Sequence, residues 1–555
     1  MNKNWKINTL TPYAQKLASK YNISSILAQL LLNRKIKEED FSSFLNPDFS
    51  CLYSPFMLPD MEKAVLRIKK ATKEKEKVLV VGDYDVDGIT SLGIFYEFAK
   101  KFKDIFSFYI PHRLKDGYGL NQNIVKEAKE RGVSLIICFD CGTNSYPEIE
   151  WARKFKIDVI VVDHHQVRQG RFSSFAFINP KRKDCFYPFS HLSSAAISFK
   201  LLQALKNTSC KNLLDLVSLS LVCDVVPLQG ENRILLKEGL KWIRKSNRPS
   251  IKMLCNIGRI KQENINPFHI GYILGPRINA SGRVACARDS LNIFFSEDEK
   301  EVFNLVNKLE EYNRLRKDIE NEVLKEADAI LNRECLDKIA IVIEKDEWHP
   351  GVLGIVASKL VEKYYRPIFL FSFEDNLGTG SARSIPSLSL IEVLDKCSDY
   401  LLVYGGHRKA AGMKIFRENI DEFKEKVNEK VEAMVSMSDL VPTLKIDLEL
   451  SFKDINMGLV EEIEKLRPFG EENPLPLFVS FRVNKKTPLK KINNGYSVWL
   501  TQEGRIFEGI IYDKDITQII EYGECLDIVY SLENNTYYNS VRLIIKDCRL
   551  SKSKS

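Results

Sequence analysis

Short apolar runs alternate with helix-like segments in the first half of the chain. Three runs are almost uninterrupted: 77–83, 133–140 and 157–163. Helical spacing of apolar residues follows the first two runs, and the segment 216–228 reads as helical or extended. Continuous apolar strands separated by helices are typical of a parallel sheet covered on both faces. The pattern therefore predicts an α/β domain in this region.

The second half of the chain changes pattern twice. Residues 301–331 carry apolar side chains at steps of three and four, which predicts a long amphipathic helix between two domains. A second, smaller α/β pattern begins near residue 338, and strand-like runs fill the region from about 443, where we expect a small β-barrel. The boundaries that we infer are 1–60 for an N-terminal extension, 61–300, 301–331, 332–436 and 437–551.

Charge and cysteine content indicate which partners and which cellular compartment suit the protein. The 82 basic and 74 acidic residues leave a net charge of +8, which permits a polyanionic partner without requiring one. Twelve cysteines are spread singly, a pattern of reduced thiols rather than of a disulfide framework. No apolar run approaches the ~20 residues of a membrane span. We therefore expect a cytoplasmic protein that does not bind a membrane.

Acidic residues follow the three predicted strands where these end, and one more lies in the segment 216–228. They are Asp83, Asp85, Asp87, Asp140, Asp163 and Asp224. Because the carboxyl ends of parallel strands share one edge of a sheet, these side chains should converge on one crevice. A single aspartate at such a position is more often a helix cap or a turn residue. Four such sites together, with two adjacent histidines, favour a metal centre instead.

Cations are needed to offset the repulsion among so many carboxylates. Oxygen ligands with one or two imidazoles suit Mg²⁺ or Mn²⁺, and the imidazoles favour Mn²⁺. A cluster of this size can hold two ions. Two ions can activate a water and stabilise the oxygens of an in-line displacement at phosphorus.

The segment 161–167, VVDHHQV, holds two of the seven histidines side by side. Neighbouring side chains on a strand point to opposite faces, so both can serve one site only where the chain turns. Basic and glycine-rich segments suit the phosphate groups of a substrate that binds at the acidic cluster, because arginine side chains and exposed backbone N–H groups both bind phosphate. They include Arg113 and Tyr118, a Gly-rich loop at 271–283 with Arg277 and Arg283, Ser381 with Arg383, and Gly405 to His407.

Four motifs, DYDVDG, DCGT, DHH and DVVPL, resemble in order and spacing the DHH phosphoesterase superfamily. Longer motifs, among them GPRINASGR, GSARS and GGHRKAAGM, are similar to those of its bacterial single-strand-specific 5′→3′ exonucleases. The similarity extends over nearly the whole chain. It implies a parallel-sheet DHH domain, joined by a long helix to a smaller α/β DHH-associated domain, and a C-terminal OB-fold barrel.

The resemblance also implies roles for individual residues. Two divalent ions, Mn²⁺ or Mg²⁺, would be bound by Asp83, Asp85, Asp87, Asp140, His164 and Asp224. His165 would contact the substrate as the catalytic histidine, and we interpret Asp163 as the residue that orients an imidazole. The substrate would be held by Arg113, Tyr118, Arg277, Asn279, Arg283, Ser381, Arg383, Gly406 and His407. In the barrel, Trp499, Tyr496 or Phe507 would stack on bases, unless they belong to its core.

Three positions depart from the family pattern. Val81 stands where many members have a histidine, residues 193–196 read SSAA instead of a Gly-rich segment, and Glu472 replaces a glycine. The function implied is hydrolysis of single-stranded DNA to 5′-mononucleotides in repair and recombination, by a monomer that works with a single-strand-binding protein and a helicase. Two alternatives stay open: a phosphodiesterase for short oligonucleotides or cyclic dinucleotides, and a non-catalytic DNA-binding replication factor.

Overall fold

A computed structural model describes residues 3–102, 104–113, 116–117, 119–168, 173–334, 338–535 and 538–551. The chain divides into two compact units. The first comprises mainly Tyr53–Asp224 and Gly239–Pro442, and the second comprises Lys3–Leu52, Val225–Glu238 and the chain from Thr443 onward. Most of the N-terminal segment therefore groups with the C-terminal strands. None of the described helices combines the length and the apolarity needed to cross a membrane.

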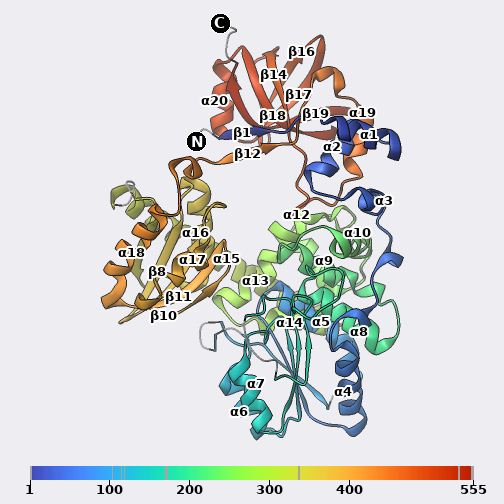
Figure 1. The fold of residues 1–555 in the computed structure, drawn as a ribbon, viewed down its shortest axis with the longest axis vertical. Coiled ribbons are helices and arrows are strands. Elements are labelled where there is room, and N and C mark those ends of the chain that lie inside the picture. Colours follow the sequence, from blue (N-terminus) through green and yellow to red (C-terminus); the bar gives the residue numbers. More distant parts are fainter. Residues whose placement is uncertain are drawn as a thin grey trace. The chain divides into compact units, whose positions relative to one another are not determined.

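The first unit contains a five-stranded parallel sheet with its strands in the order β3-β2-β4-β5-β6. Its strands are β2 (Val78–Gly82), β3 (Phe106–Tyr109), β4 (Leu135–Phe139), β5 (Asp158–Val162) and β6 (Ala176–Ile178). The three apolar runs form β2, β4 and β5, as predicted, and the short outer strands β3 and β6 were not foreseen. One face packs against α6 (Gln122–Glu130) and α7 (Tyr146–Lys154). Figure 1 shows this sheet between α6 and α7 on one side and α4 (Met61–Glu74) on the other.

Helices complete this part of the unit. They are α4 (Met61–Glu74), α5 (Val86–Ala99), α8 (Ser194–Lys206), α9 (Leu214–Cys223), α11 (Pro249–Ile257), α12 (Pro267–His269), α13 (Gly275–Val284) and α14 (Arg288–Phe295). The helix α10 (Gly230–Arg244) is divided between the two units at Gly239. The long helix predicted over 301–331 is confirmed as α15 (Glu299–Glu334). It leads into the second α/β region.

The segment 271–283 is helical, and the prediction of a Gly-rich loop there is wrong. A π-helical turn (Ile270–Leu274) runs into α13. A Cβ at Gly275 would lie 2.4 Å from the sulfur of Cys223, and one at Gly282 would lie 2.8 Å from the carbonyl oxygen of Tyr84. These glycines therefore allow close packing of a helix and do not supply the flexibility of a loop.

The second α/β region holds a mixed five-stranded sheet in the order β10-β11-β9-β8-β7. Its elements are β7 (Ile341–Asp346), α16 (Pro350–Tyr364), β8 (Ile368–Glu374), β9 (Leu377–Arg383), α17 (Leu390–Asp395), β10 (Leu401–Gly406), β11 (Ala410–Phe416) and α18 (Ile420–Glu432). Side chains of α17 and α18 pack on one face. The long helix α15 and α16 form a separate core with β7 and β8.

The second unit contains the predicted barrel. Strands β14 (Phe478–Lys485), β18 (Cys525–Asn535), β19 (Ser540–Leu550), β17 (Arg505–Ile511) and β16 (Gly495–Gln502) pair in that order, and β16 pairs with β14 to close the ring. The remaining elements are β1 (Asn4–Ile7), α1 (Pro12–Tyr21), α2 (Ser25–Asn33), α3 (Phe41–Leu45), β12 (Thr443–Ile446), β13 (Leu448–Glu449), α19 (Met457–Glu464), β15 (Lys490–Ile492) and α20 (Lys514–Tyr522).

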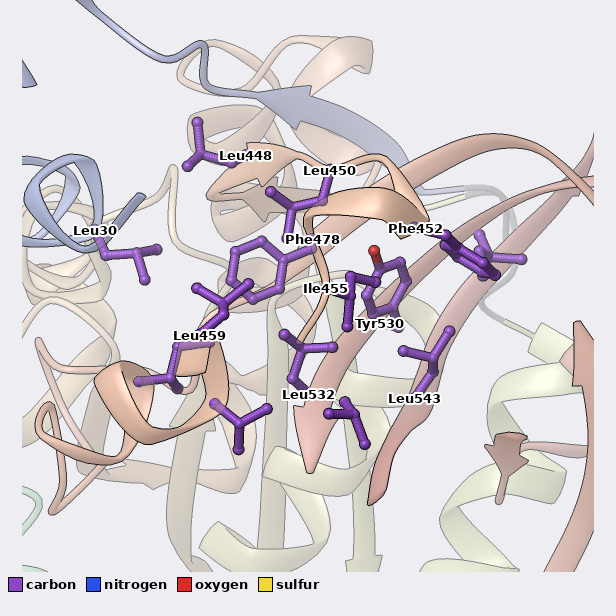
Figure 2. Close-up of a cluster of buried hydrophobic side chains, with 14 of the residues drawn as sticks. Leu30, Leu448, Leu450, Phe452, Ile455, Leu459, Phe478, Tyr530, Leu532 and Leu543 are labelled. Atoms are coloured by element: carbon purple, nitrogen blue, oxygen red, sulfur yellow. The ribbon is translucent and has the colours of Figure 1, made fainter. Parts of the chain in front are cut away.

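The barrel core joins side chains from both ends of the chain. Figure 2 shows Leu30 of α2 in the same cluster as Phe478 and Tyr530 of the barrel strands. Tyr496 and Phe507 are partly buried against this core, whereas the Trp499 side chain on β16 is 46% exposed. Of the three aromatic residues considered for base stacking, the structure therefore presents Trp499 most openly to solvent.

Candidate metal centre

The loop after β2 carries the first three carboxylates and is fixed from two sides. Asp85 caps α5, because its Oδ1 accepts hydrogen bonds from the backbone N–H groups of Asp87 (2.9 Å) and Gly88 (3.1 Å). Asn279 of α13 accepts a hydrogen bond from the backbone N–H of Val86 at 3.0 Å. Asn279, predicted as a substrate contact, thus holds the loop that presents the carboxylates.

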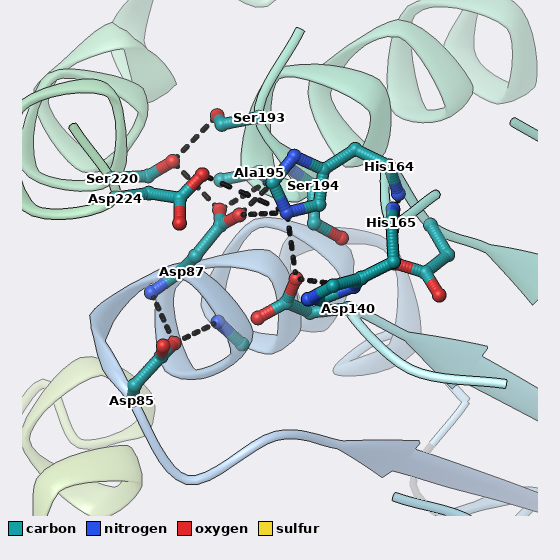
Figure 3. Close-up of polar contacts among 12 residues, drawn as sticks. Asp85, Asp87, Asp140, His164, His165, Ser193, Ser194, Ala195, Ser220 and Asp224 are labelled. Carbon is teal, nitrogen blue, oxygen red and sulfur yellow. Dashed lines mark hydrogen bonds and ion pairs between the residues drawn. The ribbon is translucent and has the colours of Figure 1, made fainter. Parts of the chain in front are cut away.

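Asp87 is held by the N-terminus of α8. Backbone N–H groups of Ser194 and Ala195 each donate to its carboxylate at 2.8 Å, and the Ser220 hydroxyl donates at 2.7 Å (Figure 3). The segment that departs from the family pattern therefore anchors a carboxylate. Ser220 was missed from the sequence; it lies one helical turn before Asp224, at the i, i+4 spacing that puts both on one face of α9.

The imidazole of His164 faces three carboxylates from different elements. Its Nε2 lies 3.4 Å from Asp140 Oδ1, 3.6 Å from Asp87 Oδ2 and 3.6 Å from Asp224 Oδ2 (Figure 3). Asp140 takes a left-handed backbone conformation (φ +60°) just after β4, and Asp224 follows the last turn of α9. Four segments spread over the first unit thus converge at one point.

His165 makes a different contact from its neighbour. Its Nδ1 lies 2.7 Å from Asp163 Oδ1, which also accepts hydrogen bonds from the backbone N–H groups of both histidines. The backbone N–H of Thr143 donates to the other oxygen of Asp163 at 3.1 Å. Because the chain has left β5 at this point, the two adjacent imidazoles face different partners.

Burial and charge shift the pKa values of this cluster in opposite directions. Burial and the neighbouring carboxylates raise the pKa of Asp83, Asp85, Asp140 and Asp224. Burial lowers the pKa of His164 to about 4. Burial also opposes ionisation of the His165–Asp163 pair, but their contact outweighs it: the pKa of His165 rises to about 9 and that of Asp163 falls.

Among the described residues, three groups of ligand atoms lie within 4.8 Å of one another: Asp83, Asp85 and Asp140; Asp87, His164 and Asp224; and Asp140, Asp163, His164 and His165. In the third group Asp163 already binds His165, so the first two groups are the ones that suit a divalent ion each. Asp83 Oδ1 and His164 Nε2 are buried without a hydrogen-bond partner among the described residues. Buried ligand atoms in that state require a cation or a proton. Carboxylate oxygens with one imidazole fit Mn²⁺ or Mg²⁺.

A cavity of about 820 Å³ is lined by His165 together with Arg113, Arg168 and Ser381 of β9. Arg283 and Arg383 lie close enough to Arg113 to repel it. Arg283 donates to the carbonyl oxygen of Gly351 at 3.1 Å, and Arg383 donates to that of Ala382 at 2.8 Å. Burial, with repulsion from Arg113, lowers the pKa of Arg283 to about 10 and also lowers that of Arg383. The cluster is a ready site for a phosphate.

Of the remaining predicted substrate contacts, some line the cavity and others do not. His407 lines the cavity, with its ring stacked 6.5 Å from that of His165, and Gly406 lies beside it. Arg277 does not join the cavity; its guanidinium pairs with Glu310 of α15 at 2.7 Å, so it contributes to helix packing. Tyr118 lies outside the described residues. Lys181, which we did not predict, is partly buried near Asp224, and burial lowers its pKa.

Models of three domain families match the chain. The DHH family N-terminal domain matches residues 77–221, the DHHA1 domain matches 337–433, and the RecJ OB domain matches 446–547. The single-stranded-DNA-specific exonuclease RecJ of Bacillus subtilis (strain 168) is 33% identical over 546 residues, which cover 97% of this chain and 70% of the relative.

Solved structures agree with this result. RecJ from Thermus thermophilus in complex with Mn²⁺ superposes with a TM-score of 0.84 at 24% identity, over 99% of this chain and 80% of that one, and supports the fold. A structure of exonuclease RecJ bound to manganese has a TM-score of 0.60 at 29% identity, over 69% of this chain and 98% of that one.

Proposed function

The chain belongs to the RecJ family of single-stranded-DNA-specific exonucleases, and from this membership we propose that it hydrolyses single-stranded DNA from the 5′ end at the Asp–His cluster. The observation that carries the proposal is the convergence of two ligand groups beside His165. Asp83, Asp85 and Asp140 would hold one divalent ion, and Asp87, His164 and Asp224 the other. When bound, such a pair of ions supplies Lewis-acid activation of water and neutralises charge at phosphorus.

His165 provides the proton-bearing group of the site. Its Nδ1 is bound to Asp163, and the ring lines the cavity, where it would contact a phosphate oxygen. The contact with Asp163 raises the pKa of this imidazole to about 9 and so favours its protonated form. A cationic donor in this place stabilises the charge that develops on the phosphate and on the leaving oxygen.

The arginine cluster is the reason for placing the start of hydrolysis at the 5′ end. Arg113, Arg283 and Arg383 would bind the terminal 5′-phosphate, and the cavity that Arg113 shares with His165 would hold the terminal nucleotide. The first phosphodiester then reaches the metal centre, and its hydrolysis releases a 5′-mononucleotide. The barrel, with Trp499 exposed, would hold the strand further along. We also propose that the protein acts as a monomer in DNA repair and recombination, together with a single-strand-binding protein and a helicase.

End-labelled strands test the proposal. With Mn²⁺ or Mg²⁺, a 5′-phosphorylated single strand should release labelled mononucleotide from its 5′ end at once, while duplex DNA stays intact. Arg383→Ala should slow digestion of phosphorylated ends on the order of 10-fold or more and hardly change 5′-hydroxyl ends. The control is Arg417→Ala, an exposed arginine that pairs with Asp346. Release from the 3′ end first, or activity on dinucleotides only, would contradict the proposal.

A further inference from the structure

Two aromatic side chains lie open to solvent where α12 runs into the π-helical turn Ile270–Leu274. Phe268 is 60% exposed and Tyr272 is 74% exposed. Their rings stack on each other, with centroids 5.0 Å apart and planes inclined at 27°. An exposed aromatic ring adds little to a core, and large apolar side chains gathered at a surface mark binding sites more often than single ones do. The pair is therefore a candidate for contact with a ligand.

The turn that carries Tyr272 lies beside the metal centre. The thiol of Cys223, the last residue of α9, donates a hydrogen bond to the carbonyl oxygen of Ile270 at 3.9 Å. The residue after Cys223 is the proposed metal ligand Asp224. On its other side the turn continues into α13, whose Asn279 holds the loop of the first carboxylates. π-Helical turns are rare and frequently lie at functional sites.

Two cations border the turn from the end of α11. A Cβ at Gly258 would lie 2.9 Å from Cγ2 of Ile273, so the residues that follow Gly258 come next to the turn. Among them Arg259 and Lys261 are exposed, and neither has an ion-pair partner in the described part of the chain. The only acid in the sequence between Lys261 and α12 is Glu263, which leaves this segment with a net positive charge.

Aromatic faces beside unpaired cations suit single-stranded nucleic acid. A base of any identity can stack on an exposed ring, because every base has a flat face. The cations then contact the phosphates on either side of that base. A protein partner would use the rings without needing the cations, so the combination favours a strand.

We propose that Phe268 and Tyr272, with Arg259 and Lys261, form a platform on which one base of the single strand stacks close to the metal centre. The inference rests on the proposed function and adds a strand-binding surface outside the barrel. Neither ring lines the cavity that would hold the 5′-terminal nucleotide. The platform therefore receives a nucleotide on the 3′ side of the scissile bond.

Removal of single bases tests the platform. Strands with phosphorothioate linkages at the 5′ end, which resist hydrolysis, would each carry one abasic site at a different position and be titrated against the Mn²⁺-loaded protein. Wild-type affinity should fall on the order of 10-fold at one position. Phe268→Ala and Tyr272→Ala should bind the intact strand more weakly by a similar factor, and should no longer respond to the abasic site at that position.

The matched control for the rings is Phe416→Ala. Phe416 is an exposed aromatic residue on β11 of the same unit, and its variant should keep the wild-type affinity and abasic-site profile. Melting temperatures should stay at the wild-type value in the platform variants, because both rings are exposed.

Salt titration tests the cations independently. Arg259→Gln and Lys261→Gln should each reduce the slope of log affinity against log salt by about one. Lys73→Gln, which changes an exposed lysine of α4, should leave the slope unchanged.

Three results would overturn the platform. They are an unchanged affinity and abasic-site profile in Phe268→Ala and Tyr272→Ala, which would assign the rings to a protein partner, an equal loss in Phe416→Ala, and a loss of affinity that only follows a loss of melting temperature. A wild-type protein that digests no single strand would refute the proposed function itself, so the two failures are distinguishable.

Discussion

The two sheets of the first unit place functional residues in different ways. In the parallel sheet, β2, β4 and β5 all end at one edge, and the loops there gather carboxylates and histidines at high electrostatic cost. In the mixed sheet, antiparallel neighbours align residues across a face, where the uncharged row Gly405, Gly412 and Ser381 lines the cavity at little electrostatic cost. The comparison teaches that strand direction decides where function can be placed: ligands at an edge, cavity-lining residues on a face.

The largest effect is expected at the metal edge. Asp140→Asn should lower kcat by about 10³-fold or more, because it removes a ligand of the first ion. It should also raise the melting temperature of the metal-free protein, since one buried like charge is removed. Mn²⁺ should then stabilise the variant less than the wild type. The control is Asp104→Asn, an exposed carboxylate of the same domain; an equal effect there would contradict the account.

An intermediate effect is expected from Asp163→Asn, which frees the His165 ring and should lower activity by about 10- to 100-fold. Burial opposes protonation of His165, but Asp163, with smaller contributions from Asp224 and Asp83, raises the pKa of its ring to about 9. The stability that this shift contributes is fully present below pH 6.5 and is lost as the pH rises through 9. Chemical denaturation of the metal-free proteins should therefore show a steeper loss between pH 6.5 and 9 in the wild type than in the variant. Parallel curves would refute this assignment.

The smallest effect is expected in the second unit. Trp499→Ala should weaken binding of long single strands on the order of 10-fold, because one stacking surface is lost. Digestion of very short strands should hardly change. Tyr522→Ala is the matched control, since Tyr522 is an exposed aromatic residue on α20 of the same unit. An equal loss in both variants would show that exposed aromatic area in general, and not Trp499, matters.

The sequence predicted the parallel sheet well, because β2, β4 and β5 are buried along their length and hence continuously apolar. It also predicted that Asp83, Asp85, Asp87 and Asp140 would meet, since the edge rule needs only strand order; Asp224 joins them from the end of the helix α9. The strand β6 was missed, because its three residues are too few to show a pattern. The motif around Arg277 wrongly predicted a substrate contact. The glycines of this motif serve helix packing, and the side chain of Arg277 pairs with Glu310, which lies on a distant segment.

Two further features depend on pairings that no local pattern reveals. Ser220 contacts Asp87 only because α9 packs beside α5, and the sequence offered no more than its spacing from Asp224. The exposed pair Phe268 and Tyr272 lies beside α9 only because the π-helical turn packs there. Aromatic residues of a core and aromatic residues open to a ligand look alike in the sequence, and only the surroundings of each ring separate them.

The central claim is that the adjacent histidines have separate roles, with His164 as a metal ligand and His165 as a substrate contact. Calorimetric titration of the metal-free protein with Mn²⁺ tests it most directly. The account predicts two bound ions in the wild type, two in His165→Ala and fewer in His164→Ala, with cleavage lost in both variants. Loss of an ion in His165→Ala, or two tightly bound ions in His164→Ala, would contradict it.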